Sequence, residues 1–223
     1  KSREGIMSNE ERRCLLDEKV DVLLECPFSE DVTSMSAEDF IRKILIEKIH
    51  ARYIVIGTDF HFGHDKRGDA KMLAEYAGVY GYELFVIEKE MYGKREISSS
   101  YVREELRKGN MEAVNDMLGY AYTVRGKVEH GRQLGRKLGF PTLNVHPSRD
   151  KLLPPNGVYL DSVRIDGIWY NGIGNVGFKP TVSDENRMLI ESNLLDYSGD
   201  AYGKEVEIQL YHFKRPEQKF ESI

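Results

Sequence analysis

Two hydrophobic patterns divide the chain near its middle. Up to Leu118 the apolar positions recur at helical spacing or gather in short runs, whereas from Tyr120 onward they fall in short strand-like segments. Helices alternating with strands predict parallel βα units and an α/β layer, and a run of short strands with turn signals predicts an antiparallel structure. We therefore expect two domains, residues 1–118 and 119–223, with the boundary near Gly119.

Helices are predicted in the first domain at residues 9–17, 36–49, 69–80 and 100–108. Ser36 and Asp39 have the spacing of a helix-capping pair, and Gly109 is expected to end the last helix. The helix that begins at Ser36 carries an apolar stripe that we expect to be buried, formed by Phe40, Ile41, Ile44, Leu45 and Ile49.

Three strands are predicted between these helices. Residues 20–25 and residues 84–87 are short apolar runs. Residues 53–56 are rich in β-branched side chains and lie directly before Gly57, which predicts a fully buried strand.

The second domain carries clear strand and turn signals. Asp166-Gly167 separates two strand-like runs, at residues 158–165 and 168–173, and this dipeptide is a strong hairpin signal. Further on, the apolar residues of 206–210 alternate with polar ones, which predicts a half-buried antiparallel strand.

The composition is that of an ordinary globular protein and excludes some classes of function. The net charge of −5 argues against a nucleic-acid binder, whose footprint is a dominant basic face. No apolar run approaches the roughly 20 residues that a membrane span requires, and the N-terminus has no signal-peptide segment. We therefore predict a cytoplasmic protein that binds neither nucleic acid nor membranes. Cys14 and Cys26 lie far apart without other metal ligands nearby, so we expect reduced, structural cysteines.

A glycine-rich, basic stretch runs from Gly126 to Asn144 and suggests phosphate binding. Its glycines let the backbone approach a polyphosphate, and its basic side chains supply positive charge. Thr142 and Asn144 stand two residues apart, so on an extended backbone their oxygens point the same way and are suited to Mg²⁺. The alternative is a turn region that is basic by chance, because the spacing of a Walker-type phosphate loop is absent.

Glu191 is the candidate catalytic base. It stands among alternating apolar residues, where its carboxylate either faces a substrate or lies on an exposed strand face, and the residues alone leave both open. Transfer of a phosphoryl group to an alcohol commonly uses such a carboxylate to accept the hydroxyl proton.

Three motifs resemble the riboflavin kinase module of bacterial bifunctional flavokinase and FAD synthetase. They are G-x-V-x-x-G from Gly126, G-R-x-L-G-F-P-T-x-N from Gly135, and L-P-x-x-G-V-Y from Leu153. The resemblance implies an antiparallel six-stranded β-barrel after a Rossmann-like α/β nucleotidyltransferase domain that lacks its opening strand, so that this chain should not make FAD efficiently. The implied substrates and cofactors are ATP, Mg²⁺ and the flavins riboflavin, FMN and FAD.

The same resemblance assigns roles in the kinase domain. It makes Glu191 the catalytic base, although Asn193 stands where the family often has histidine. It implies that flavin contacts come from Asn175 and Arg215, and that Mg²⁺ is held by Thr142 and Asn144. The implied nucleotide-binding residues are Gly131, Gly135, Arg136, Gly139, Thr142 and Asn144.

Two elements of the first domain are assigned in the same way. His61 to His64 spell H-x-G-H, the phosphate-binding signature of nucleotidyltransferases, but their place in the chain fits a later element of FAD synthetases that contains Asp59 and Phe62. His61 stands there in place of the usual arginine. The second element, a helix N-terminus suited to an anion, comprises Ser98, Ser99, Ser100 and Arg103.

Two other functions are weighed against an ATP-dependent flavin kinase that acts on small molecules. One is a non-catalytic flavin- or nucleotide-binding regulatory module, which would bind flavin without phosphorylating it. The other is a barrel that binds nucleic acid, which the acidic charge and the absence of interleaved basic and aromatic residues disfavour. The sequence makes no prediction of the oligomeric state.

Overall fold

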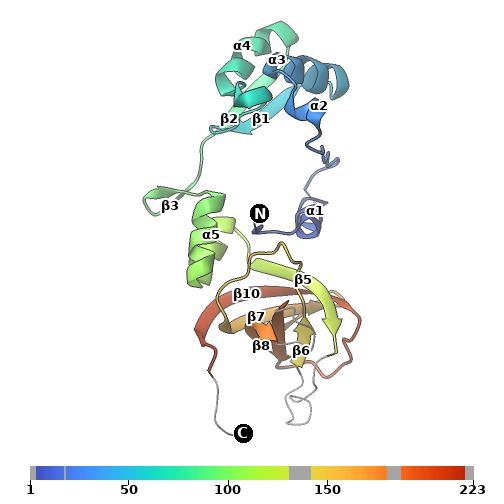
Figure 1. Ribbon diagram of the computed structural model, residues 1–223, viewed down its shortest axis with the longest axis vertical. Coiled ribbons are helices and arrows are strands. Elements are labelled where there is room, and N and C mark those ends of the chain that lie inside the picture. Colours follow the sequence, from blue (N-terminus) through green and yellow to red (C-terminus); the bar gives the residue numbers. More distant parts are fainter. Residues whose placement is uncertain (1–3, 18, 131–141, 180–186, 219–223) are drawn as a thin grey trace. The chain divides into compact units, whose positions relative to one another are not determined.

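The computed structural model describes residues 4–17, 19–130, 142–179 and 187–218 (Figure 1). The chain forms two compact units. One is Leu24–Ile97, and the other joins Lys1–Leu23 to Ser98–Ile223. The two units are defined by the packing of the chain. The boundary near Gly119 was predicted from the sequence pattern, and it stays a prediction.

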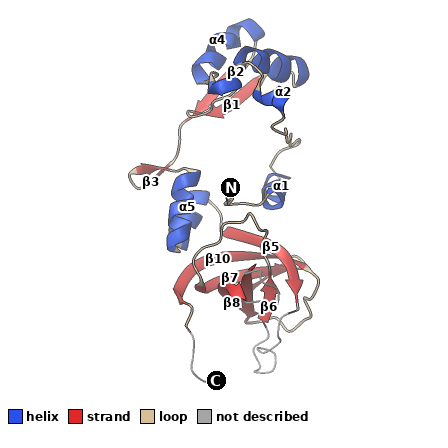
Figure 2. Ribbon diagram, viewed as in Figure 1, coloured by secondary structure: helices blue, strands red, loops and turns tan. Residues whose placement is uncertain are grey.

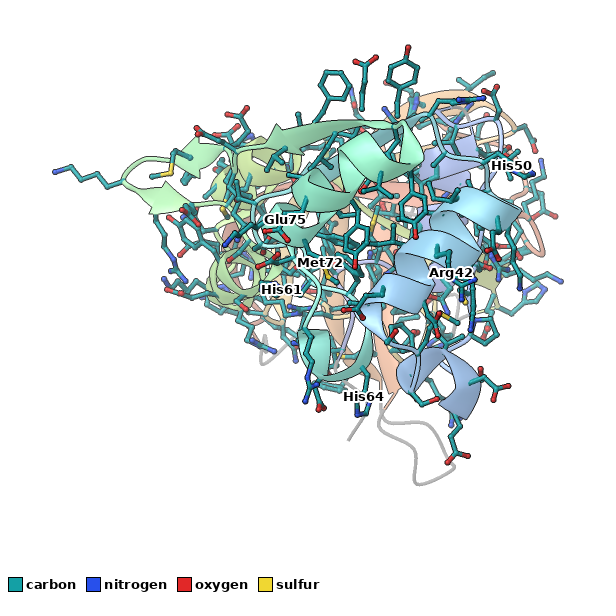
Figure 3. The ribbon with its side chains drawn as sticks, turned by 90° about the horizontal axis from the view of Figure 1, so that it is seen from above. Arg42, His50, His61, His64, Met72 and Glu75 are labelled. Carbon is teal, nitrogen blue, oxygen red and sulfur yellow. The ribbon has the colours of Figure 1, made fainter. Side chains whose placement is uncertain are left out.

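The unit Leu24–Ile97 is a small α/β layer. Its elements are α2 (Glu30–Thr33), α3 (Ala37–Asp39), the π-helix η1 (Phe40–Lys48), β1 (Tyr53–Gly57), the 3₁₀-helix η2 (His64–Lys66), α4 (Ala70–Tyr80), β2 (Glu83–Ile87), β3 (Met91–Tyr92) and β4 (Arg95–Glu96). Strands β1 and β2 are parallel, as predicted. Their buried side chains pack with η1 and α4, where Figure 3 labels Arg42 and Glu75.

The long helix predicted from Ser36 begins as expected and then changes type. The Ser36 hydroxyl accepts a hydrogen bond from Asp39 N at 3.1 Å, which caps α3. From Phe40 the backbone continues as a π-helix, whose wider turn changes the direction of each later side chain. Ile41 is fully buried, but Ile49, at the end of the predicted stripe, is 46% exposed, so its predicted burial was wrong.

Two strand predictions in this region were also wrong. Strand β1 is buried on one face only, because η1 and α4 pack on the side of Ile54 and Ile56, and Val55 on the other side is 64% exposed. Residues 20–25 form no strand. Within the described residues this segment pairs with neither β1 nor β2, and Val22 and Leu24 are exposed, so the apolar run has no neighbouring strand to complete its hydrogen bonds.

In its described residues, the other unit is a closed antiparallel barrel with three helices (Figure 2). The helices are α1 (Asn9–Asp17), α5 (Ser99–Lys108) and α6 (Met111–Leu118), and the strands are β5 (Tyr122–Glu129), β6 (Thr142–Val145), β7 (Gly157–Ile165), β8 (Ile168–Lys179), β9 (Arg187–Leu194) and β10 (Glu205–Pro216). The strand order is β10-β5-β6-β9-β8-β7. The predicted six-stranded barrel is therefore confirmed.

Local signals explain much of this unit. Asp166 and Gly167 both have positive φ, 50° and 85°, and join β7 to β8 as the hairpin signal predicts. The apolar side chains of β10 that alternate with polar ones are buried in the barrel, including Ile208 and Leu210 at 0% exposure. None of the helices in the described ranges is long and apolar enough to cross a membrane.

The N-terminal helix is fixed to the barrel by a buried ion pair. Lys151 Nζ lies 2.6 Å from Glu11 Oε2, and the two side chains are 1% and 5% exposed. The same ammonium donates to the backbone oxygens of Ile6 at 2.8 Å and Thr123 at 2.6 Å, so its charge is fully hydrogen-bonded. Burial lowers the pKa of Lys151, and the Glu11 carboxylate opposes that shift. This buried cluster, centred on the Lys151 ammonium, thus joins α1 to β5.

Candidate functional site

One row of directly paired residues crosses the barrel. Glu191 on β9 is paired with Asn144 on β6 at one side and with Asn175 on β8 at the other. The row continues from Asn175 to Val158 on β7 and from Val158 to Arg215 on β10. Directly paired residues of antiparallel strands project from the same face of the sheet. Four residues predicted from separate segments of the sequence therefore share one face.

This row lies on the outer face of the barrel. Ile190 and Ser192, on either side of Glu191 in β9, are fully buried, so Glu191 projects outward and is half-buried. Thr142 is paired with Asn193 and lies two residues before Asn144, which puts it on the same outer face. The predicted common direction of the Thr142 and Asn144 side chains agrees with this register.

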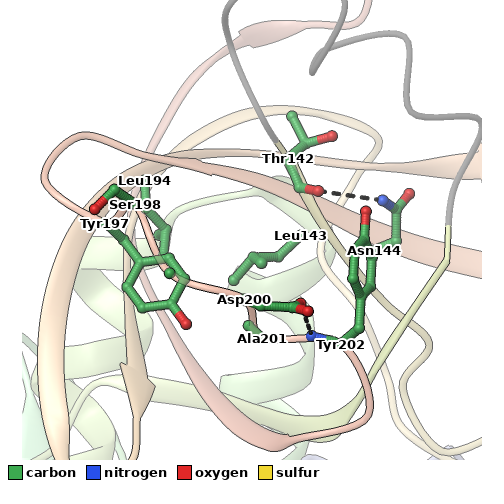
Figure 4. A pocket seen from close by; sticks show the side chains of 10 residues that line it. Thr142, Leu143, Asn144, Leu194, Tyr197, Ser198, Asp200, Ala201 and Tyr202 are labelled. Carbon is green, nitrogen blue, oxygen red and sulfur yellow. Dashed lines mark hydrogen bonds between the residues drawn. The ribbon is translucent and has the colours of Figure 1, made fainter.

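A pocket of about 250 Å³ opens beside the row (Figure 4). Its walls come from β6, from the end of β9 and from the loop before β10, and its residues are Thr142, Leu143, Asn144, Leu194, Tyr197, Ser198, Gly199, Asp200, Ala201 and Tyr202. The Asn144 side-chain amide donates to the Thr142 backbone oxygen at 3.5 Å. The Asn144 amide oxygen and the Thr142 hydroxyl are two neutral oxygens of the kind that suits a hard cation.

The loop 197–202 was missed by the sequence reasoning. Asp200 accepts a hydrogen bond from Tyr202 N at 3.0 Å, which fixes a turn, and the Tyr202 ring stacks on His130 with centroids 3.9 Å apart. The Ser-Gly-Asp sequence of this loop is typical of a turn, but it does not indicate that the turn faces β6. The site therefore includes an acidic and aromatic wall that only the folded chain reveals.

The phosphate-binding part of the prediction falls outside the described residues. This applies to Gly131, Gly135, Arg136 and Gly139, which precede β6. Within the described ranges there is no cluster of three or more His, Cys, Asp or Glu side chains that could hold a metal ion. A cation at this site would therefore depend on neutral protein oxygens and on oxygens of its substrate.

The predicted flavin residues lie on the other side of Glu191 from Asn144, with Asn175 next to Glu191 and Arg215 at the end of the row. Asn175 Nδ2 donates to Glu217 Oε1 at 3.5 Å, and the Arg215 guanidinium donates to the Pro216 backbone oxygen at 3.3 Å. Glu217 is a polar neighbour of Asn175 that the sequence reasoning did not identify. The roles of Asn175 and Arg215 stay predictions.

Asp59 and Phe62, predicted for the adenylyltransferase site, belong to the unit Leu24–Ile97 and differ in exposure. Asp59 is exposed, and its ion pair with Lys89 Nζ at 2.8 Å lowers the pKa of the Asp59 carboxyl. Phe62 is 7% exposed and packs against Phe40 with ring centroids 5.3 Å apart. The ring also lies so close to Gly68 that a Cβ there would be 2.5 Å from it. Phe62 thus packs in the core.

The serine cluster belongs to the other compact unit. Ser98 caps α5 by accepting a hydrogen bond from Tyr101 N at 3.2 Å, and Ser99 and Ser100 are exposed in the first helical turn. The Arg103 guanidinium donates to the Glu4 backbone oxygen at 3.4 Å. A helix start of this kind presents free backbone N–H groups to an anion, and its predicted role stays a prediction.

Comparisons with known proteins match two families to different parts of the chain. The riboflavin kinase family model matches residues 118–223, which include all six barrel strands, and the FAD synthetase family model matches residues 1–101. A crystal structure described as a macrolide-efflux protein from Streptococcus pneumoniae is 30% identical with a TM-score of 0.86. It covers 98% of this chain, which spans 70% of that protein.

Relatives named bifunctional riboflavin kinase/FMN adenylyltransferase are similar along most of the chain. The one from Listeria monocytogenes is 35% identical over 206 residues, which are 92% of this chain but only 64% of the relative. The one from Escherichia coli strain K12 is 33% identical over 217 residues, which are 96% of this chain and 68% of the relative. The chain thus spans about two thirds of the length of these relatives.

The barrel, its row of polar residues and the two family matches define the class, a riboflavin kinase barrel joined to FAD synthetase sequence. More specifically, the chain belongs to the bifunctional riboflavin kinase/FMN adenylyltransferase family.

Proposed function

We propose that the barrel phosphorylates riboflavin to FMN with ATP. The observation that carries this proposal is the pairing of Glu191 with Asn144 and Asn175 in one row beside a pocket. This arrangement supports the proposal because phosphoryl transfer needs a proton acceptor, a phosphate site and a held alcohol within a short distance of one another.

Glu191 is the proposed base. A half-buried carboxylate between Asn144 and Asn175 is partly shielded from water and can accept the proton of the riboflavin primary hydroxyl as the phosphoryl group transfers. The products are FMN, ADP and the proton held by Glu191. The neighbours Asn144 and Asn175 are neutral and can donate hydrogen bonds to the reacting oxygens.

Thr142 and Asn144 are the proposed Mg²⁺ ligands. Their two neutral oxygens lie on one face beside the pocket, and such oxygens suit a cation that takes its other ligands from phosphates and water. The ion would neutralise charge on the transferring phosphate. The glycine-rich residues Gly131 to Gly139 remain proposed nucleotide contacts on sequence grounds.

Asn175 and Arg215 are the proposed flavin contacts, since they continue the row away from the pocket that contains Thr142. This order would place the phosphate donor at the β6 end and the flavin toward β10, with Glu191 between them. The row spans five adjacent strands, which is a rigid support for two substrates that must be aligned.

We propose a second activity for the whole protein, adenylylation of FMN to FAD. Its support is the FAD synthetase match over residues 1–101 together with the named relatives. Asp59, Phe62, Ser98 to Ser100 and Arg103 are the proposed contributors from this chain. A cytoplasmic location and small-molecule substrates belong to the same proposal.

The direct test is incubation of the chain with riboflavin, ATP and Mg²⁺, followed by chromatography of the flavins. The proposal predicts FMN that accumulates with time and requires both ATP and Mg²⁺. Binding of riboflavin without any FMN would favour the non-catalytic flavin-binding module, which the comparisons do not support.

A further inference from the structure

A buried carboxylate lies inside the barrel, directly behind the row. Asp161 on β7 is only 3% exposed and is paired with Gly172 on β8 and with Leu210 on β10. In the part of the chain that the structure describes, neither carboxylate oxygen of Asp161 has a hydrogen-bond partner, and neither has the hydroxyl of the fully buried Ser192. Buried polar groups without partners are rare, because each costs desolvation energy, so this cluster requires a physical explanation.

Two glycines make the space for this carboxylate. A Cβ at residue 172 would lie 2.5 Å from Asp161 Oδ1 and 2.9 Å from both Ser192 Oγ and the Asn193 backbone oxygen. A Cβ at residue 174 would lie 2.4 Å from Asp161 Oδ2. These distances are too short for real contacts, so the absence of side chains at Gly172 and Gly174 is what admits Asp161.

The cluster touches the same two strands that carry the proposed catalytic row. Ser192 follows Glu191 on β9, Gly174 precedes Asn175 on β8, and Gly174 is paired with Ser192. Successive residues of a strand face opposite sides of the sheet. Asp161 therefore lies, inside the barrel, against Gly174, which precedes Asn175, and near the side chain of Ser192, which follows Glu191.

The surroundings of Asp161 favour its neutral form. Its interior neighbours are Val163 and Tyr159 on β7, Gly172 and Gly174 on β8, Ile190 and Ser192 on β9, Leu210 on β10 and, across Leu210, Tyr122 on β5. Among these described neighbours the titratable side chains are the two tyrosines, and burial raises the pKa of both. Burial also raises the pKa of Asp161 to about 7, and the nearby Ser192 hydroxyl opposes part of that rise.

We propose that Asp161, as the neutral acid, is a positioning residue that holds β8 and β9 from inside the barrel and so keeps Asn175 and Glu191 in line. The neutral acid has a hydrogen to donate to Ser192 Oγ or to the Asn193 carbonyl, and the carboxylate has none. An ionised Asp161 would instead draw water or a partner into the apolar interior and shift the two strands. This inference rests on the proposed kinase function.

The kinetic test compares the pH dependence of kcat for riboflavin phosphorylation in wild type and Asp161→Asn. If the neutral acid is required, wild-type kcat falls by up to about tenfold per pH unit above pH 7, while KM changes little. Asp161→Asn cannot ionise and should keep its kcat through the same range. Asp166→Asn, at the exposed turn that ends the same strand, is the matched control and should retain the wild-type fall.

A second variant keeps the test decisive if Asp161→Asn fails to fold. Asp161→Val fills a similar volume without a titratable group, and it should also lack the alkaline fall. If wild type and both variants share one alkaline limb, or if wild type has none, the positioning role is wrong.

A third measurement is independent of activity. Infrared difference spectra at pH 6 should show the C=O band of a protonated carboxylic acid in wild type that is missing in Asp161→Asn. A chain that makes no FMN at any pH but shows this band would refute the proposed kinase while leaving the neutral acid in place. Absence of the band from wild type would overturn the inference whatever the activity.

Discussion

Asn144 on β6 stands directly opposite Glu191 on β9. Side chains paired in this way have Cβ atoms about 4.5–5.5 Å apart, so a proposed metal ligand and the proposed base occupy neighbouring positions on one surface. The two residues are far apart in sequence, and only the barrel brings them together. The account of function depends on this pairing.

The first prediction concerns the hydroxyl of Thr142. Replacing it in Thr142→Val removes one proposed Mg²⁺ ligand, so the Mg²⁺ concentration that gives half-maximal kinase activity should rise by at least about tenfold. Thr142→Ser keeps the hydroxyl and should stay near wild type. Titration of activity with Mg²⁺ at fixed ATP measures the effect, and equal Mg²⁺ requirements for the two variants would remove Thr142 from the metal site.

The second prediction concerns the buried pair of Lys151 and Glu11. Glu11→Gln leaves the buried ammonium without its counter-charge and should cost about 3–5 kcal/mol in the free energy of unfolding measured with denaturant. Lys204→Met is the control, because its ion pair with Asp166 joins side chains that are 38% and 66% exposed, and such a loss costs at most about 1 kcal/mol. Similar losses in both variants would mean that the buried pair does not fix α1 to the barrel.

The third prediction is a pH dependence of stability that originates at Asp161. Its pKa is about 7 in the folded barrel and near its ordinary value of 3.8 in the unfolded chain. The folded state therefore binds the proton more tightly. The stabilisation is complete below about pH 4, declines as the pH rises, and is lost above about pH 7.

The loss should amount to about 4 kcal/mol in total, at up to about 1.4 kcal/mol per pH unit. The difference in unfolding free energy between wild type and Asp161→Asn, measured from pH 4 to pH 8, isolates this contribution from those of other groups. A difference that stays constant over that range would show that Asp161 ionises in the folded barrel as readily as in the unfolded chain.

The fourth prediction concerns the hairpin between β7 and β8. Gly167 has a φ of 85° and no atoms within 4 Å of the place of a Cβ, so Gly167→Ala introduces backbone strain without a steric clash. We expect a loss of about 1–2 kcal/mol in unfolding free energy. Gly167→Asn should cost less, because asparagine tolerates the left-handed region. Equal costs for alanine and asparagine would contradict the conformational explanation.

The parts of the fold that follow from local chemistry could be predicted from the sequence. Alternation fixed the buried face of β10, Ser36 and Gly109 marked helix ends, and Asp166-Gly167 marked the hairpin. These features depend on a residue and its near neighbours. The barrel itself was expected from family motifs rather than from any local pattern.

The errors have a different origin. Val22 lies in an apolar run that resembles a strand. A strand also needs a neighbouring strand with which to form hydrogen bonds, and the sequence of the run does not indicate which segment lies beside it. The π-helical turn after Phe40 and the helix α6 were not predicted. Helix α6 is joined to the barrel through Asn115, whose side chain donates to the Leu210 backbone oxygen at 3.0 Å and accepts from Tyr122 N at 2.7 Å.

The same limit applied to the site. Thr142, Asn144 and Glu191 were chosen from composition and motif. The common direction of Thr142 and Asn144 was predicted from their spacing, but that Glu191 shares their face followed only from the strand register. The pocket wall formed by Asp200 and Tyr202 and the partner Glu217 of Asn175 had no sequence signal, because each depends on contacts between distant segments.

The most direct test of the central claim, the fifth prediction, is kcat for riboflavin phosphorylation by Glu191→Gln at saturating Mg-ATP. Loss of a general base typically lowers the rate by about 10²–10⁴-fold, so we expect a fall of that size with little change in riboflavin KM. Glu205→Gln, which removes an exposed carboxylate from β10, should keep the wild-type rate. A Glu191→Gln enzyme with near-wild-type kcat would contradict the account.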